Sequence, residues 1–315
     1  MDELADNSNP EVHAMTDFPD QTGKVAIVTG ANSGLGFETA LALAANGATT
    51  ILACRSKAKA EEACARIVEQ HPDATVQAAE LDVSELASVR AFAKRFLAKR
   101  KRLDLLINNA GVMATPQQTT ADGFELQFAT NHLGPFALTG LLMKALLASP
   151  ASRVVALSSL AARTGRIDFG DLMGARRYEP WKAYGQSKLA DLMFARELQR
   201  RLAAAGITQT ISLAAHPGVS STNLFGSKDI ATLMRFLQPV EKLVFQPPAQ
   251  GVLPTLFAAT SPKAKPGGYY GPNGLFELRG TPAAAFVPLQ ARSQSNARLL
   301  WDKSEELTGL RYLFA

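Results

Sequence analysis

The 315-residue sequence predicts an α/β fold built on a doubly wound parallel sheet with helices on both faces. Three observations lead to this prediction. Continuous apolar runs, such as residues 24–29 and 103–107, are typical of strands that are buried on both faces. Segments with helical patterning separate the runs, as parallel strands require. Glycine-rich or polar turns follow the runs, and ligands bind at that edge of such a sheet.

The individual elements follow from apolar runs bounded by glycines, prolines and polar residues. Strands are predicted at residues 24–29, 49–54, 75–81, 103–107, 153–157 and 207–214, with a last strand and turn at 267–272. Helices are predicted at residues 37–46, 57–70, 84–102, 119–147, 180–204 and 293–308. Pro135 is expected to make its helix irregular near Asn131, because proline lacks a backbone donor. Residues 1–22 are expected to form a flexible arm, and residues 23–315 a single domain.

The first strand runs directly into the glycine-rich turn 30–36, which leads into a helix. This strand–turn–helix arrangement is typical of the Rossmann fold. There the backbone approaches a pyrophosphate closely, and the helix N-terminus supplies free N–H groups. A tight loop without a ligand is the plainer interpretation of the glycines alone. Their position between strand and helix favours a dinucleotide cofactor.

The residue that follows the second strand indicates which dinucleotide binds. An acid about 20 residues beyond the glycines accepts the ribose 2′-hydroxyl of NAD. Arg55 instead stands 19 residues beyond Gly36, and no Asp or Glu follows until Glu61. A guanidinium suits a 2′-phosphate, which favours NADP(H) over NAD(H). A solvated residue after the strand is the alternative interpretation of Arg55.

Polar residues follow three further strands at the same predicted edge. Asp82 is either an acceptor that faces an adenine or an N-terminal cap for the helix from Ser84. Asn109 lies in the turn after the fourth strand, and Ser159 ends the fifth. A serine in that position is ordinarily a turn residue. Because these side chains converge on one edge, they favour a ligand site.

Tyr184 and Lys188 are four residues apart in the predicted helix 180–204, so they share one face. A free phenol has a pKa of roughly 10. A neighbouring ammonium lowers that pKa, so that the hydroxyl can exchange a proton with an alcohol or a carbonyl. Taken alone, the pair is better explained as a solvated surface contact. The other motifs favour the catalytic interpretation.

Composition and charge argue against several other classes of protein. Net charge is +5, from 33 basic and 28 acidic residues, and the basic run 94–102 lacks base-stacking aromatic residues beyond Phe96. Cations at a helix C-terminus explain the run better than a nucleic-acid or anionic-membrane patch. No apolar run reaches the ~18 residues of a membrane span, and the N-terminus has no signal-peptide pattern, so a cytoplasmic location is expected. Cys54 and Cys64 form no metal-type pair, and no metal site is predicted.

The order of the motifs resembles the short-chain dehydrogenase/reductase family. The matching segments span residues 24 to about 225 and read TGANSGLG, NNAG, NHLG, SS, YGQSK and HPGVSSTNL. Within the family the chain is similar to the branch of retinol dehydrogenases and protochlorophyllide reductases. That similarity rests on ACRS after the second strand, on NHLG, and on the spacing of 25 residues from Ser159 to Tyr184. Many retinol dehydrogenases carry a membrane-anchoring N-terminal segment; residues 1–22 are polar, so integral membrane attachment is not expected. No cysteine follows Cys64, so light-driven chemistry is not expected either.

The resemblance implies a role for each matched position. Tyr184 would be the general acid/base, and Lys188 would lower the pKa of Tyr184 and hold the nicotinamide ribose. Ser159 would position the substrate oxygen, and Asn131 would hold a water in a proton relay to Lys188. With Gly30 and Arg55 added from the residues themselves, the predicted cofactor-binding set is Gly30, Ser33, Gly34, Leu35, Gly36, Arg55, Asp82, Val83, Asn109, Ala110, Gly111, Tyr184, Lys188, Pro217, Gly218, Val219 and Thr222.

The predicted function is an NADP(H)-dependent oxidoreductase that interconverts a carbonyl and an alcohol on a hydrophobic small molecule. The alternative is a non-catalytic regulatory protein that binds NADP. Residues 223–260 are strongly apolar and are expected to form a mobile lid over the substrate; a packed helix pair or a subunit interface is the other interpretation. No nucleic-acid partner and no integral membrane segment are expected, and the chain can be a monomer or a homo-oligomer.

Overall fold

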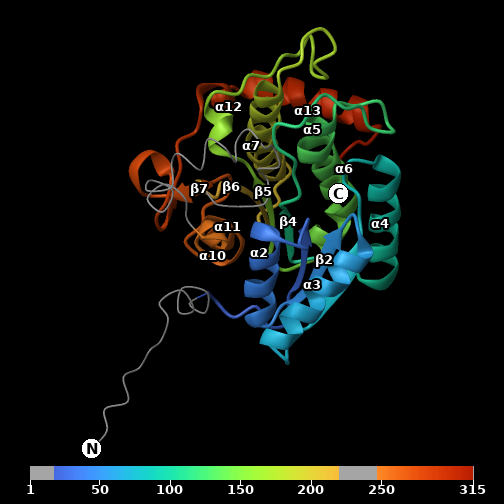
Figure 1. Cartoon of the computed structure of the whole chain (residues 1–315), viewed down its shortest axis with the longest axis vertical. Helices are drawn as coiled ribbons and strands as arrows, with labels where there is room; N and C mark the ends of the chain where they lie inside the picture. The colour runs from blue at the N-terminus through green and yellow to red at the C-terminus, as the bar shows by residue number, and fades with distance from the viewer. Residues whose placement is uncertain (1–17, 220–246, 315) are drawn as a thin grey trace, which may run out of the picture.

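The computed structural model describes residues 18–219 and 247–314. Within them an eight-stranded sheet has the order β3-β2-β1-β4-β5-β6-β7-β8 (Figure 1). Neighbouring strands from β3 to β7 are parallel, whereas β8 runs antiparallel to β7. The strands are β1 (Val25–Thr29), β2 (Thr49–Cys54), β3 (Val76–Glu80), β4 (Leu105–Asn108), β5 (Ser152–Leu157), β6 (Thr210–Ala215), β7 (Tyr269–Pro272) and β8 (Pro282–Ala284).

Helices cover both faces of the sheet, so the predicted doubly wound α/β architecture is confirmed (Figure 1). One face holds an apolar core that includes Phe37, Ile67 and Leu256. Its helices are α2 (Gly34–Ala45), α3 (Lys57–Gln70), α10 (Pro248–Gly251) and α11 (Leu253–Thr260). The other face holds a second core that includes Phe136 and Trp301. Its helices are α4 (Leu86–Lys99), α5 (Leu126–Phe128), α6 (Gly134–Leu147), α7 (Pro180–Ala204), α12 (Leu289–Arg292) and α13 (Gln294–Thr308).

Helix α4 begins later than predicted, and Asp82 does not cap it. The Asp82 carboxylate accepts hydrogen bonds from the N–H and the hydroxyl of Ser84, which forms a turn before the helix. The N–H of Leu86 instead donates to the Asp122 carboxylate at 2.8 Å. The cap therefore comes from a residue 36 positions away, which local sequence reasoning could not find.

The predicted helix 119–147 is also shorter and is interrupted. Glu125 caps the start of α5 by accepting the N–H groups of Gln127 and Phe128, so residues before it are not helical. Residues 129–133 form a π-helical turn before α6. Pro135 offers no N–H to the carbonyl four residues earlier, which explains the irregularity predicted around Asn131.

The C-terminal third contains two departures from expectation. Strand β7 is not the last strand, because β8 follows it and completes the sheet. Residues 247–260 are packed helices: Val252 and Leu256 are buried in the core beneath α10 and α11. The lid prediction is therefore wrong for that part, while residues 223–246 and Thr222 lie outside the described residues. Among the described helices, none combines the length and the apolar character of a membrane span.

Candidate active site

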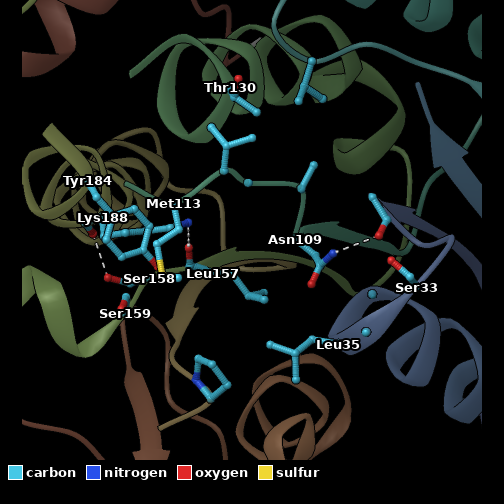
Figure 2. Close-up of a pocket in the computed structure, with 18 of the residues that line it drawn as sticks. Ser33, Leu35, Asn109, Met113, Thr130, Leu157, Ser158, Ser159, Tyr184 and Lys188 are labelled. Atoms are coloured by element: carbon cyan, nitrogen blue, oxygen red, sulfur yellow. Dashed lines mark hydrogen bonds between the residues drawn. The ribbon is translucent and has the colours of Figure 1, made fainter. Parts of the chain in front are cut away.

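A cavity of about 620 Å³ opens at the carboxyl ends of the parallel strands (Figure 2). Predicted site residues from the glycine turn, from the turns after β2 to β6 and from α7 all reach it. They are Gly30, Ser33, Gly34, Leu35, Gly36, Arg55, Asp82, Val83, Asn109, Ala110, Gly111, Ser159, Tyr184, Lys188, Pro217, Gly218 and Val219. The cavity thus brings together every predicted site residue in the described ranges except Asn131.

The glycine turn is closed against the loop that follows β4. Asn109 donates from Nδ2 to the Thr29 carbonyl at 2.7 Å, and the Thr29 hydroxyl accepts the Asn109 N–H at 3.0 Å. A Cβ on Gly36 would overlap both the Asn109 amide and the Gly30 carbonyl, so only glycine fits there. Ser33 precedes α2 without a side-chain cap, which leaves N–H groups of the first turn available to an anion.

Two cations lie at the far end of the cavity. Arg55 and Lys59 both line it, both are exposed, and neither forms an ion pair within the described part of the chain. Ser56 lies between them, caps α3 and also lines the cavity. Sequence reasoning missed Lys59, although its position in the first turn of α3, four residues after Arg55, was available as a signal.

Asp82 and Val83 form the wall beside this end. The Val83 carbonyl lies where a Cβ of Gly134 would be, so α6 packs directly on the turn that follows β3. Glycine at position 134 thereby lets the NHLG segment approach the cavity wall.

At the other end, Tyr184 and Lys188 are buried side by side on α7, and Ser159 lies next to them (Figure 2). Their exposed fractions are 7% for Tyr184 and 6% for Lys188, which excludes the solvated surface pair. Lys188 Nζ donates to the Leu157 carbonyl at 2.7 Å and to the Asp191 carboxylate at 3.0 Å. The helix is fixed to β5 because the Ser158 hydroxyl donates to the Lys188 carbonyl.

Ser159 and Asn131 both form hydrogen bonds within the chain. The Ser159 hydroxyl lines the cavity and accepts the Ala161 N–H at 3.2 Å. The Asn131 side chain bonds both the N–H and the carbonyl of Val112 and donates to the Ser187 hydroxyl at 2.8 Å. Its amide therefore fixes the Gly111–Val112 backbone against α7.

The loop after β6 is held by a cluster of three side chains, His216, Glu277 and Arg163, of which only His216 is fully buried. His216 Nε2 and Glu277 Oε2 are 2.8 Å apart, and Arg163 approaches the same carboxylate oxygen at 2.7 Å. Burial lowers the pKa of His216, an effect that Glu277 opposes. The Val219 N–H donates to the Leu278 carbonyl, so this group positions the Pro217–Val219 wall of the cavity.

Two further residues near Tyr184 escaped the sequence reasoning. Trp181 lines the cavity mouth with 53% of its surface exposed, and its ring lies edge-on to Tyr184 at 6.1 Å. Asp191 lies behind Lys188, and burial raises its pKa to about 7, whereas Lys188 opposes that rise. Helical spacing could have indicated Trp181 and Asp191, because they share a face of α7 with Tyr184 and Lys188.

The fold and this arrangement define a dinucleotide-binding oxidoreductase of the Rossmann type. The chain belongs to the short chain dehydrogenase family, whose model matches residues 24–231. Members of this family use NAD or NADP, so the oxidoreductase class of the protein is established. The resemblance stated from the motifs is confirmed.

Comparison with individual proteins also places the chain in this family. Mouse retinol dehydrogenase 12 is 41% identical over 293 residues, which cover 92% of this chain and 88% of the relative. Human retinol dehydrogenase 13 is 43% identical over 297 residues, with 91% and 85% covered. A crystal structure of an uncharacterized protein from Mycobacterium paratuberculosis is 40% identical with a TM-score of 0.78, and it covers 94% of this chain and 97% of its own. The chain therefore lies in the retinol dehydrogenase-like branch.

Proposed function

We propose that this protein is an NADP(H)-dependent enzyme that interconverts a hydrophobic carbonyl compound and its alcohol, with Tyr184 as general acid/base. The observation that carries the proposal is the single cavity that joins the buried Tyr184 and Lys188 to Arg55 and the glycine turn. A regulatory protein that only binds the dinucleotide would not need a phenol and an ammonium buried together at the other end.

The residues of the cavity fit the dinucleotide. The crowded turn at Gly36 and the uncapped first turn of α2 form a cradle of backbone N–H groups for a pyrophosphate. Arg55 and Lys59 form no ion pair with the described residues and supply two cations for a 2′-phosphate. No acidic residue lies between them in the sequence to accept a 2′-hydroxyl. Lys188 and the Pro217–Val219 loop would hold the nicotinamide end.

The chain's own groups provide the proton chemistry. When bound, NADPH would supply the hydride. Tyr184 gives its phenolic proton to the carbonyl oxygen in reduction and takes it back in oxidation. The Lys188 ammonium stabilises the phenolate, and the Ser159 hydroxyl holds the substrate oxygen near Tyr184. Asn131 keeps Gly111 and Val112 in place beside Lys188.

The substrate end of the cavity indicates an apolar ligand. Met113, Leu126, Leu160 and Trp181 line it together with Tyr184. Burial of apolar surface contributes about 25 cal/mol per Å², so these side chains favour extended hydrocarbon substrates. The retinol dehydrogenases at 41–43% identity are named for such a molecule. A retinoid or a long-chain aldehyde is therefore the substrate class that we propose.

The proposal is tested by mixing the purified protein with NADPH and a panel of aldehydes, ketones, quinones and steroids. We expect NADPH loss that equals alcohol formation, with kcat/KM at least roughly tenfold higher for retinal or a long-chain aldehyde than for a short polar aldehyde. Tight NADPH binding without alcohol formation from any member of the panel would support the regulatory alternative instead.

Cofactor preference is tested with Arg55→Ala. Loss of a charge-assisted phosphate contact is expected to weaken NADPH binding by about 10- to 100-fold and NADH binding by less than about twofold. Titration of cofactor fluorescence measures both. Lys57→Ala is the matched control, because Lys57 begins the same helix but pairs with Glu61 and does not line the cavity. Equal weakening of NADPH and NADH would show that Arg55 does not read the 2′-phosphate.

A further inference from the structure

A buried carboxylate lies directly behind Lys188 and has no part in the proposed chemistry so far. Asp191 Oδ2 is 3.0 Å from Lys188 Nζ, and the two side chains are 5% and 7% exposed. Burying such a pair is costly unless each charge is compensated, so the carboxylate and the ammonium depend on one another. The pair therefore forms part of the environment of Tyr184.

The three residues are arranged in a row on α7. Tyr184, Lys188 and Asp191 occupy positions i, i+4 and i+7, which lie on one face of a helix. Lys188 lies between Tyr184 and Asp191 along this face of the helix. Tyr184 and Asp191 are two helical turns apart, about 10 Å along the axis. At that separation a carboxylate still acts on the ionisation of a phenol in a protein interior.

The hydrogen bonds of Lys188 define what Asp191 does to it. An ammonium has three N–H donors. One donates to the Leu157 carbonyl and one to Asp191, which leaves a single donor for the cavity that Lys188 lines. Asp191 thus determines the direction in which the remaining N–H points.

His132 closes the row on the other side and adds no charge. Its Nε2 is 2.8 Å from the Ser304 hydroxyl, which itself donates to the Leu300 carbonyl, so Nε2 carries the proton. Nδ1 then has no proton, lacks a hydrogen-bond partner among the described residues and lies 4.0 Å from Asp191 Oδ1. Burial lowers the pKa of His132 to about 3. Lys188 is therefore the charged partner of Asp191 in the described part of the chain.

We propose that Asp191 is a positioning residue for the reaction, which holds the Lys188 ammonium against Leu157 and weakens the positive field that this ammonium exerts on the Tyr184 phenol. The inference rests on the proposed function of Tyr184. Above pH 7 Asp191 is ionised, so it acts in the pH range in which a phenol beside an ammonium loses its proton.

The other titratable groups near Tyr184 are not changed by a substitution at position 191. Tyr269 faces it from β7, and burial raises the pKa of Tyr269. Glu277, Arg163 and His216 lie beyond that ring. None of them contacts Asp191 in the described structure, so a change at position 191 acts through Lys188 and His132.

Asp191→Asn removes the negative charge but keeps the hydrogen bond that holds Lys188, because the amide oxygen can still accept from Lys188 Nζ. For carbonyl reduction Tyr184 must be protonated, so its ionisation sets the alkaline midpoint of the kcat/KM profile. We expect this midpoint to move down by about one pH unit while the plateau of kcat stays within about threefold. Glu197→Gln is the matched control: Glu197 is a buried carboxylate on the same helix that pairs with Arg200 and Arg201, away from the cavity. An unchanged or raised midpoint in Asp191→Asn would overturn the inference.

Asp191→Leu removes both charge and acceptor, and kcat should fall roughly 100-fold because the ammonium is no longer held. Equal losses of kcat in the Leu and Asn variants with no change of midpoint would indicate a structural role only. Phenolate absorbance of Tyr184, with Tyr184→Phe as the blank, reports the same midpoint without any substrate. This titration distinguishes the two failures: an inactive wild type would overturn the proposed function, while an unmoved phenolate midpoint would overturn the role of Asp191.

Discussion

Tyr184→Phe is expected to lower kcat by at least about 1000-fold and to leave the Kd for NADPH within about twofold. Positioned general acids and bases contribute roughly 100- to 10,000-fold, and no other phenol lines the cavity within the described residues. The ring itself is retained, so its edge-on contact with Trp181 and its packing on α7 persist. Single-turnover kinetics with saturating NADPH and retinal, together with a fluorescence titration of the cofactor, measure the two quantities.

The matched control removes a phenol elsewhere. Tyr178 is partly buried, and its hydroxyl donates to the Thr115 carbonyl outside the cavity. The hydroxyl also accepts a hydrogen bond from Gln127 Nε2 at 2.8 Å. Tyr178→Phe removes these bonds, so it should cost about 1–3 kcal/mol of stability and leave kcat near the wild-type value. A Tyr184→Phe enzyme with more than about a tenth of wild-type kcat would mean that another group moves the proton.

Gly36→Ala is expected to weaken NADPH binding by about 10- to 100-fold. The added methyl would overlap the Asn109 amide and the Gly30 carbonyl, which together close the cradle. The Asn109 amide cannot move without breaking its bond to the Thr29 carbonyl, and overpacking of this kind costs about 1–3 kcal/mol. Isothermal titration with NADPH measures the loss, and circular dichroism verifies that the fold is retained.

Gly206→Ala is the control for the glycine substitution. Gly206 follows α7 with φ at 74°, and no atom lies within 4 Å of a Cβ built there. The substitution strains the backbone by about 1 kcal/mol and should leave NADPH affinity unchanged. If Gly36→Ala also binds NADPH normally, the pyrophosphate does not lie against this turn.

Local signals predicted the elements whose ends are set by local chemistry. Helix α7 begins with Pro180 and ends just before Gly206, and its bounds agree with the prediction to the residue. Helix α4 depends on the distant cap at Asp122, and β8 is a three-residue strand whose pairing with β7 decides its existence. Residues 247–260 have the same apolar composition whether they cover a ligand or a core. The packing of Leu256 in the core shows that these residues cover the core.

The sequence predicted those site residues whose type is required by local geometry or charge. The glycines, Arg55, Asn109 and Tyr184 follow from backbone space, charge and helical spacing, and all line the cavity. Asn131 does not line the cavity, and its amide donates hydrogen bonds to the Val112 carbonyl and the Ser187 hydroxyl. The roles of Trp181, Lys59 and Asp191 depend on contacts that only the folded structure shows. Their types alone are ordinary for helices.

Transfer of deuterium from the reactive carbon of the cofactor tests the central claim most directly. The wild-type protein is incubated with NADPH deuterated at the hydride-donating position and with retinal or a long-chain aldehyde, and the product is analysed by mass spectrometry. Our account predicts an alcohol with one deuterium on the former carbonyl carbon, formed in step with cofactor loss, and no such product with Tyr184→Phe. Alcohol without deuterium, or no alcohol from any carbonyl compound despite bound NADPH, would contradict it.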